Sequence, residues 1–213
     1  MRFFDRKSAG FELARHLEKL CLVRPVVLGI PRGGVVVAAE IARILNCDLD
    51  VILSRKLPVP WQPELALGAV SEEGRIFWNP EVAALVQLPE DQLNNIRNSV
   101  MQEIRRRKNL YRTVCSKMSV GDRTVILVDD GLATGATMIS AILEIRSHQP
   151  QSVIVAIPVA ASSSLEQVRN LADEVICLVD DPDFQAVGYY YQNFQQVEDQ
   201  EVIKLLEINQ NSQ

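Results

Sequence analysis

Cysteines are few in this sequence, and their positions exclude two common kinds of site. The 213 residues include 4 cysteines, which are Cys21, Cys47, Cys115 and Cys177. Because no two of them are separated by only two residues, the chain has no CxxC pair for redox chemistry or zinc binding. We expect these thiols to be reduced and structural.

Long apolar runs and a dominant charge are also lacking. No stretch approaches the ~20 apolar residues that cross a bilayer, and residues 1–17 lack the apolar segment of a secretory signal. The 22 Lys and Arg residues against 27 Asp and Glu residues give a net charge of -5. This balance argues against nucleic acid or an anionic membrane as a partner. The expected location is the cytoplasm.

The familiar nucleotide motifs are missing as well. Neither a GxxxxGK loop nor a GxGxxG loop occurs, so ATP and NAD chemistry lose support. No group of residues has the spacing of a metal site. The two histidines, His16 and His148, lie far apart in helical patterns, and we interpret both as structural.

What is present is an alternation of short apolar runs with helical patterns. Apolar residues make up 47% of the chain, enough for a full core. The runs at residues 25–30, 49–54, 124–130, 152–158 and 174–181 alternate with helical periodicity at 34–45, 136–147 and 163–171. Continuous apolar runs indicate strands that are covered on both faces. We therefore predict an α/β fold with a doubly wound, mainly parallel sheet of about five strands.

One segment interrupts this alternation. Residues 57–120 contain a proline-rich stretch followed by a polar helical pattern at about 89–118. We predict a single domain over 1–213, with 57–120 as an insertion of a flexible loop plus a long helix, and 182–213 as a C-terminal hood or tail. Trp61 and Trp78 flank the insertion, where packing is favoured over gating of a site. The basic helix at 97–117 is interpreted as a solvated or intersubunit face, with RNA or an acidic partner as the alternative.

The stretch "TVILVDDGLATGAT", residues 124–137, leads from an apolar run through two aspartates into small residues. Small side chains leave backbone N–H groups accessible and threonines add hydroxyl donors, which suits a phosphate group. Asp129 and Asp130 could accept hydrogen bonds from the vicinal hydroxyls of a ribose. The alternative is that the aspartates are solvated turn residues and the threonines are helix caps.

The same stretch resembles the phosphoribosyl-pyrophosphate (PRPP) motif of type I phosphoribosyltransferases. Two other stretches fit: "IPRGG", residues 30–34, resembles the family's pyrophosphate loop, and "SRKLP", residues 54–58, resembles its Arg-Lys pair at a strand end. The start, "FDRKSAGFELA", residues 4–14, is similar to that of a group of predicted phosphoribosyltransferases. The resemblance implies a type I phosphoribosyltransferase-like fold with a hood.

The resemblance also implies a set of PRPP-binding residues. They are Arg32, Gly33, Gly34, Arg55, Lys56, Asp129, Asp130, Ala133, Thr134, Gly135, Ala136 and Thr137. Cations at Arg32, Arg55 and Lys56 would stabilise the charge that grows on departing pyrophosphate, although surface solvation is the alternative for them. Asp129 and Asp130 would orient the ribose, and both could contact the expected Mg²⁺ cofactor through water. A cis peptide bond between Pro31 and Arg32 is implied too.

The acceptor is less well marked. "DFQAVGYYYQNF", residues 183–194, resembles the base-binding segment of purine-salvage members, which makes Phe184 the candidate for stacking on a base. Two departures from the pattern of the members that act on 6-oxopurines weaken the case for such a base as the acceptor. Residues 158–160 contain no lysine, and Ala133 stands where those members carry an acidic general base. Glu64 is the nearest match to the catalytic glutamate of adenine members. Asn193 stands where related tails carry a metal-associated aspartate.

The resulting hypothesis is a PRPP-dependent phosphoribosyltransferase of nucleotide salvage, acting on a nitrogen base that is more purine-like than pyrimidine-like. The first alternative is a non-catalytic PRPP-binding or nucleotide-binding regulator. The second is an unrelated phospho-ligand protein, which would leave Arg32, Gly33 and Gly34 without a role. A homodimer is left open.

Overall fold

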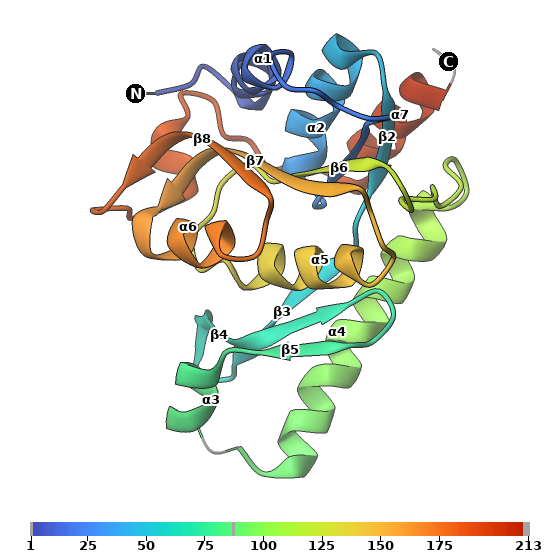
Figure 1. The fold of residues 1–213 in the computed structure, drawn as a ribbon. Coiled ribbons are helices and arrows are strands. Elements are labelled where there is room, and N and C mark those ends of the chain that lie inside the picture. The colour runs from blue at the N-terminus through green and yellow to red at the C-terminus, as the bar shows by residue number, and fades with distance from the viewer. Residues whose placement is uncertain (1, 87, 211–213) are drawn as a thin grey trace.

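A five-stranded parallel sheet forms the centre of the molecule. The computed structural model describes residues 2–86 and 88–210, apart from the side chains of Pro63, Glu64 and Glu81. The strands are β1 (Val26–Gly29), β2 (Asp48–Val51), β6 (Thr124–Val128), β7 (Ser152–Ala161) and β8 (Glu174–Asp181). Their order is β2-β1-β6-β7-β8, and every neighbouring pair is parallel (Figure 1). The predicted sheet is confirmed, except that β2 ends before Ser54, which begins a second sheet.

Helices cover both faces of this sheet. Helices α1 (Arg6–Leu17) and α2 (Gly33–Leu45) lie on one face, and α5 (Ala136–Arg146) and α6 (Ser162–Arg169) lie on the other (Figure 1). Residues 125–128 of β6 are all apolar, and their packing shows why. Ile126 and Val128 belong to the core with α1 and α2, whereas Val125 and Leu127 belong to the core with α5. Both faces of the strand are therefore buried.

A second, antiparallel sheet replaces the flexible loop expected in the insertion. It consists of β3 (Ser54–Val59), β4 (Gln62–Ser71) and β5 (Ile76–Trp78), and α5 contacts both β3 and β4. Leu57, Val59 and Leu67 are buried in the core, so the segment has an apolar face of its own. Pro58 lies at a register shift, where a strand tolerates proline. The expectation of a flexible loop was wrong. The prolines in this segment suggested a loop, although its apolar residues follow the pattern of strands.

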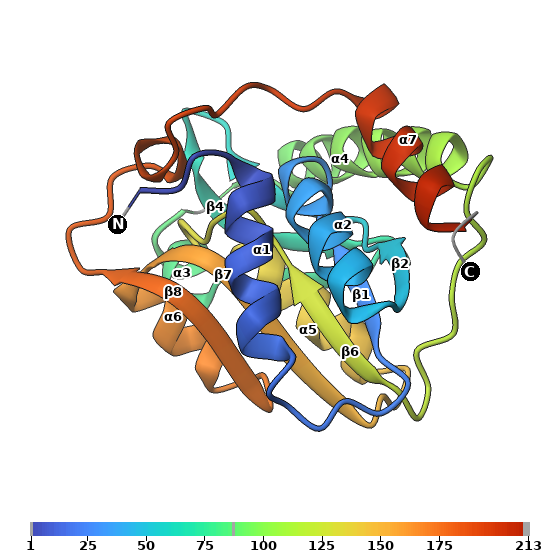
Figure 2. The same cartoon turned by 90° about the horizontal axis from the view of Figure 1, so that it is seen from above.

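Two further helices complete the insertion. Helix α3 (Pro80–Leu85) is short, and α4 (Glu90–Tyr111) runs along the side of the molecule from the antiparallel sheet towards α7 (Asp199–Gln210) (Figures 1 and 2). Helix α4 ends earlier than the predicted residue 118. The hydroxyl of Tyr111 donates to Oδ1 of Asp199 at 2.6 Å, which ties the end of α4 to the start of α7.

The chain's first residues and its C-terminal segment lie side by side. Phe3 forms an isolated β-bridge with Tyr191, directly after the short 3-10 helix η1 (Val187–Tyr190). Beyond it the C-terminal segment crosses the top of the view in Figure 2 to reach α7. The buried Tyr191 donates its hydroxyl to the backbone oxygen of Asp130 at 2.7 Å, so this segment contacts the loop after β6. Within the described residues, no helix is long and apolar enough to cross a membrane.

Candidate active site

A charged cavity of about 330 Å³ lies at the carboxyl end of the parallel sheet. It is lined by Ile30, Pro31, Arg32, Gly33, Ser54, Arg55, Lys56, Arg107, Asp129, Asp130 and Thr137. Four cationic side chains face two carboxylates, so the cavity favours a ligand with several negative charges. In open α/β sheets this is the edge at which ligands bind. The three stretches singled out in the sequence thus meet in one cavity, hereafter the active-site cavity.

The loop after β1 packs directly on the loop after β6. A Cβ atom at Gly33 would lie 1.9 Å from Oδ2 of Asp130, and one at Gly34 would lie 2.7 Å from the backbone oxygen of Val128. Any side chain at either position would push the two loops apart. The Pro31–Arg32 peptide bond in the same loop is cis, as the resemblance implies. Close contact between loops therefore accounts for both glycines.

The two aspartates have different environments. Oδ1 of Asp129 accepts a hydrogen bond from the backbone N–H of Asp130 at 2.8 Å. Burial, and next the charge of Asp130, raises the pKa of the Asp129 carboxyl well above its ordinary value. Oδ2 of Asp130 instead accepts from Nε of Arg6 at 2.7 Å. Asp130 is thus held by a cation, whereas Asp129 accepts a hydrogen bond from the backbone of its neighbour.

Arg6 is a site residue that the sequence reasoning missed. It lies at the start of α1, and its guanidinium carbon is 3.9 Å from the centre of the Phe194 ring. The same side chain donates to the backbone oxygen of Gln195 at 2.8 Å. Arg6 therefore links Asp130 to the C-terminal segment. The only sequence signal was its place in the start motif, because residues 6 and 130 are far apart along the chain.

The cations of the cavity come from three segments. Arg32 follows β1, Arg55 and Lys56 lie in β3, and Arg107 lies in α4. Burial lowers the pKa of the Arg55 guanidinium, and the positive charge of Arg107 adds to this effect. Such mutual repulsion is relieved when an anion binds between the cations.

Arg107 corrects the interpretation of the basic helix. The sequence reasoning assigned the whole helix to a solvated or intersubunit face, yet the Arg107 side chain is only 12% exposed. Its Nε donates to Glu103 at 2.8 Å, and its guanidinium lies 3.4 Å from the backbone oxygen of Pro31. Helical periodicity alone could not show this, because the cavity wall forms only when α4 packs against the loop after β1.

The loop after β6 ends at the start of α5. Gly135 has a φ of +73°, which favours glycine, and no side chain caps the helix. Ser164 donates its hydroxyl to the backbone oxygen of Ala133 at 2.6 Å, which fixes the loop. The helix N-terminus is suited to an anion. Thr137 lines the active-site cavity, whereas Thr134 and Ala136 line a neighbouring cavity of about 600 Å³ together with Trp78.

Phe184 and Asn193, two of the residues named for the acceptor, are not among the described residues that line the active-site cavity. Phe184 stacks on Tyr190 with ring centres 5.5 Å apart. Asn193 donates its backbone N–H to Phe4, and it lines a separate small cavity with Arg6. Glu64 belongs to β4, but its side chain lies outside the described residues.

The two tryptophans do not fit the packing role that the sequence favoured. Trp61 is 65% exposed and Trp78 is 45% exposed. Trp61 lies at the turn between β3 and β4, and Trp78 ends β5. The turn and the strand end leave these rings at the surface of the antiparallel sheet.

A parallel sheet whose carboxyl-edge loops surround a cationic cavity beside paired aspartates defines the class of phosphate-binding α/β proteins. A narrower assignment comes from comparison with known proteins. Residues 11–193 match the family model described as "Phosphoribosyl transferase domain". The chain belongs to this family, and its α/β fold is that of type I phosphoribosyltransferases.

Two kinds of relatives support the assignment. Two Mycobacterium tuberculosis proteins, each named "Putative phosphoribosyl transferase", are 40% identical over 205 residues, or 96% of this chain and 46% of theirs. The chain thus spans about half the length of these relatives. The crystal structure of TT1426 from Thermus thermophilus is 43% identical, with a TM-score of 0.83 and coverage of 98% and 99% of the two chains.

A more distant structure shares the fold alone. The purine phosphoribosyltransferase of Pyrococcus horikoshii is 16% identical, with a TM-score of 0.50 over 91% of this chain and 92% of that one.

Proposed function

We propose that this protein transfers the 5-phosphoribosyl group of PRPP to a nitrogen base, more purine-like than pyrimidine-like, and releases pyrophosphate. The observation that carries the proposal is the meeting of four cations and the Asp129–Asp130 pair in one cavity beside an uncapped helix N-terminus. PRPP carries a phosphate at one end of its ribose and a pyrophosphate at the other. The cavity offers a complementary group for each part.

In the proposed complex, each part of PRPP has its own binding group. The 5-phosphate lies in the loop of residues 133–137, at the N-terminus of α5. The ribose hydroxyls donate to Asp129 and Asp130. The pyrophosphate lies among the cations Arg32, Arg55, Lys56 and Arg107.

Catalysis then follows from charge placement. When the bond from C1 to pyrophosphate breaks, the electron pair leaves with the pyrophosphate, and the base nitrogen bonds to C1 and releases its proton to water. The four cations stabilise the charge that grows on the leaving group, and removal of one such donor typically lowers the rate by about 10²–10³-fold. Asp129 and Asp130 hold the sugar so that C1 faces the acceptor.

Carboxylate oxygens are the ligands that Mg²⁺ prefers, and the aspartate pair fits that cofactor. Because Oδ2 of Asp130 is bound by Arg6 and Oδ1 of Asp129 accepts a backbone N–H, the pair would hold Mg²⁺ through water. When bound, Mg²⁺ would neutralise pyrophosphate charge.

For the acceptor, the resemblance supports the proposal that Phe184 stacks on the base. It also supports Glu64 as the counterpart of the catalytic glutamate of adenine members. The aromatic pair of Phe184 and Tyr190 offers an apolar face, since Phe184 is partly exposed. Stacking on an aromatic ring suits a flat base.

Calorimetry with PRPP and Mg²⁺ tests the binding step, and pyrophosphate exchange across a panel of purine and pyrimidine bases tests the transfer. We expect PRPP to bind more tightly than ribose 5-phosphate and at least one base to support exchange. Tight PRPP binding without exchange on any base would favour the regulatory alternative. Failure to bind PRPP would contradict both.

A further inference from the structure

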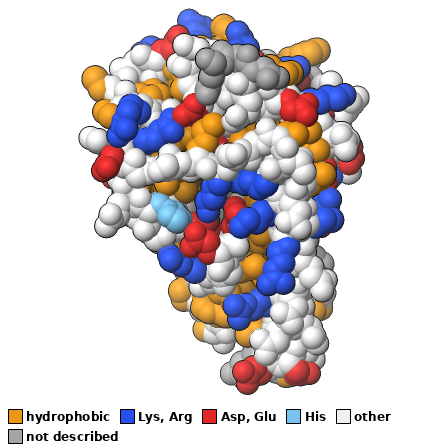
Figure 3. Space-filling view, turned by 90° about the vertical axis from the view of Figure 1, so that its right-hand side faces the viewer, with side chains coloured by type: hydrophobic (Ala, Val, Ile, Leu, Met, Phe, Trp, Pro, Cys, Tyr) orange, Lys and Arg blue, Asp and Glu red, His pale blue; other side chains and the backbone are white. Residues whose placement is uncertain are grey.

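A second charged cavity lies beside the C-terminal half of α5. It has a volume of about 180 Å³, and its lining includes Asp50, Glu72, Lys117, Glu144 and His148. None of its lining residues lines the active-site cavity. Figure 3 shows this side of the molecule, where acidic and basic side chains gather beside a histidine. We call this hollow the acid–histidine cavity.

Glu144 is the unusual residue of this cavity. It is only 2% exposed, and its Oε2 atom has no hydrogen-bond partner among the residues that the structure describes. Burial raises the pKa of the Glu144 carboxyl above its ordinary value. The Ser71 hydroxyl and the charge of Lys117 act against this rise, and the charges of Glu72 and Glu73 add to it. A buried carboxylate oxygen without a hydrogen-bond partner is costly, so it calls for a proton or a cation.

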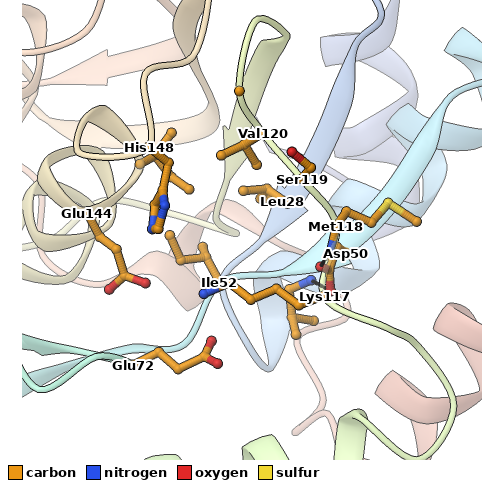
Figure 4. A pocket seen from close by; sticks show the side chains of 13 residues that line it. Leu28, Asp50, Ile52, Glu72, Lys117, Met118, Ser119, Val120, Glu144 and His148 are labelled. Atoms are coloured by element: carbon orange, nitrogen blue, oxygen red, sulfur yellow. Dashed lines mark hydrogen bonds between the residues drawn. The ribbon is translucent and has the colours of Figure 1, made fainter.

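His148 supplies a nitrogen next to this carboxylate. Figure 4 shows the Glu144 side chain and the His148 ring on one side of the cavity, with the Lys117 side chain reaching towards them from the other side and Glu72 below. Nε2 of His148 lies 3.3 Å from Oε1 of Glu73 but makes no hydrogen bond with any described residue. One donor atom from each of Glu73, Glu144 and His148 lies within 4.8 Å of the other two.

We propose that Glu73, Glu144 and His148 bind a divalent transition-metal cation of the Zn²⁺ type. An imidazole nitrogen with two carboxylates suits Zn²⁺, whereas Mg²⁺ and Ca²⁺ prefer oxygen ligands alone. Donor atoms around a tetrahedral Zn²⁺ lie about 3.4 Å apart, so the three groups must close in slightly. Glu73 and His148 can do so because their side chains are 34% and 35% exposed.

Three cations lie next to the carboxylates of this region. Lys108 lies 2.8 Å from Oε1 of Glu72 and balances that carboxylate. Lys117 lies 3.7 Å from Glu73, and Arg75 lies 3.6 Å from it. Lys117 is 46% exposed and Arg75 is 52% exposed, so both charges can move into water when a metal binds.

A metal at this position would join two parts of the fold. Glu144 lies in α5 and His148 just after it, whereas Glu73 lies in the turn between β4 and β5. A cation held by all three would fasten the antiparallel sheet to α5. Since the ligands converge only in the folded chain, binding should stabilise the native state.

Co²⁺ and Zn²⁺ titrations of the whole, chelator-treated protein test this site. Co²⁺ reports through its visible absorption, and Zn²⁺ reports through calorimetry and the melting temperature. His16 is the only other histidine and is exposed on α1, so His16→Ala is the matched control for His148→Ala. We expect wild type and His16→Ala to bind one equivalent and to melt at a higher temperature with Zn²⁺.

His148→Ala should bind at least about tenfold more weakly and lose most of the Zn²⁺ stabilisation. Glu144→Gln should weaken Zn²⁺ binding similarly. If Glu144→Gln does not fold, the result for His148→Ala decides the test. No binding by wild type, or equal binding by His148→Ala, would overturn the proposal. In that case, protonation of Glu144 explains how its carboxyl group is buried without a metal.

Discussion

The two charged cavities use similar residue types for opposite purposes. In the active-site cavity, four cations outnumber two carboxylates, and Asp130 is already held by Arg6. In the acid–histidine cavity, Lys108 balances Glu72, while the buried Glu144 keeps an oxygen without a partner. The first cavity therefore has positive charge to offer and the second has negative charge. The sign of the unbalanced charge separates an anion site from a cation site.

The largest expected effect comes from Asp129→Asn. The change keeps the side chain's shape and its acceptor for the N–H of Asp130 but removes the charge proposed to orient the ribose. We expect phosphoribosyl transfer to fall by about 10³-fold, measured as pyrophosphate release.

Two controls accompany this variant. Asp122→Asn changes an exposed aspartate in a turn, and His148→Ala changes the other cavity. Both should keep transfer within about twofold of wild type, since distant sites act independently. Equal activity of Asp129→Asn and wild type would remove Asp129 from the proposed mechanism.

Gly33→Ala should have the next largest effect. The new Cβ would lie 1.9 Å from Oδ2 of Asp130, so the loops must separate and the Arg6–Asp130 ion pair must move. Overpacking of this kind costs about 1–3 kcal/mol. We expect a lower melting temperature and PRPP affinity reduced by about 10-fold or more.

Gly121→Ala is the matched control for that change. Its Cβ would lie 3.6 Å from the backbone oxygen of His148, which is an ordinary contact. If both alanine variants bind PRPP equally well, the contact between the two loops does not control the site.

Arg107→Ala tests the cation that the structure adds to the cavity. Removing a charged hydrogen-bond donor costs about 1.5–3 kcal/mol, so PRPP affinity should fall by about tenfold or more. Ribose 5-phosphate, which has no pyrophosphate, should bind nearly as before in calorimetry. Arg105→Ala, on the exposed side of the same helix, should change neither affinity. An equal loss for both ligands would place Arg107 away from the pyrophosphate.

The smallest effect is on stability, and it depends on pH. The raised pKa of Asp129 means that folding favours its protonated form. That contribution is complete below about pH 3.9, the ordinary Asp value, and is lost as pH rises through the folded value. At pH 7 the Asp129 carboxyl therefore contributes less to the stability of the free protein than it does in acid.

Asp129→Asn should then raise the melting temperature at pH 7 by roughly 2–4 °C, and the gain should shrink towards pH 4. Thermal melts across this range measure it. A gain that is larger in acid than at neutral pH would contradict the assigned direction.

Much of the fold was predictable because each parallel strand is a short apolar run that can be recognised in the local sequence. Residues 125–128 of β6 are apolar and are followed by two aspartates and then small residues, and β8 has the predicted bounds of 174–181. The antiparallel sheet was missed because Pro58 and its neighbours suggested a loop. Arg6 and Arg107 were missed because nothing local in either helix indicates that Arg6 will reach Asp130 or that Arg107 will line the cavity.

Local sequence specifies the strand-loop-helix units, the glycines at the start of α2 and the small-residue loop after β6, because strand pattern and turn chemistry are local properties. Tertiary structure decided which charges meet. Arg6 reaches Asp130, Arg107 reaches the loop after β1, and Glu73 reaches His148 only when distant segments pack together. Electrostatic interactions depend on distance and burial, and neither can be read from the order of residues along the chain.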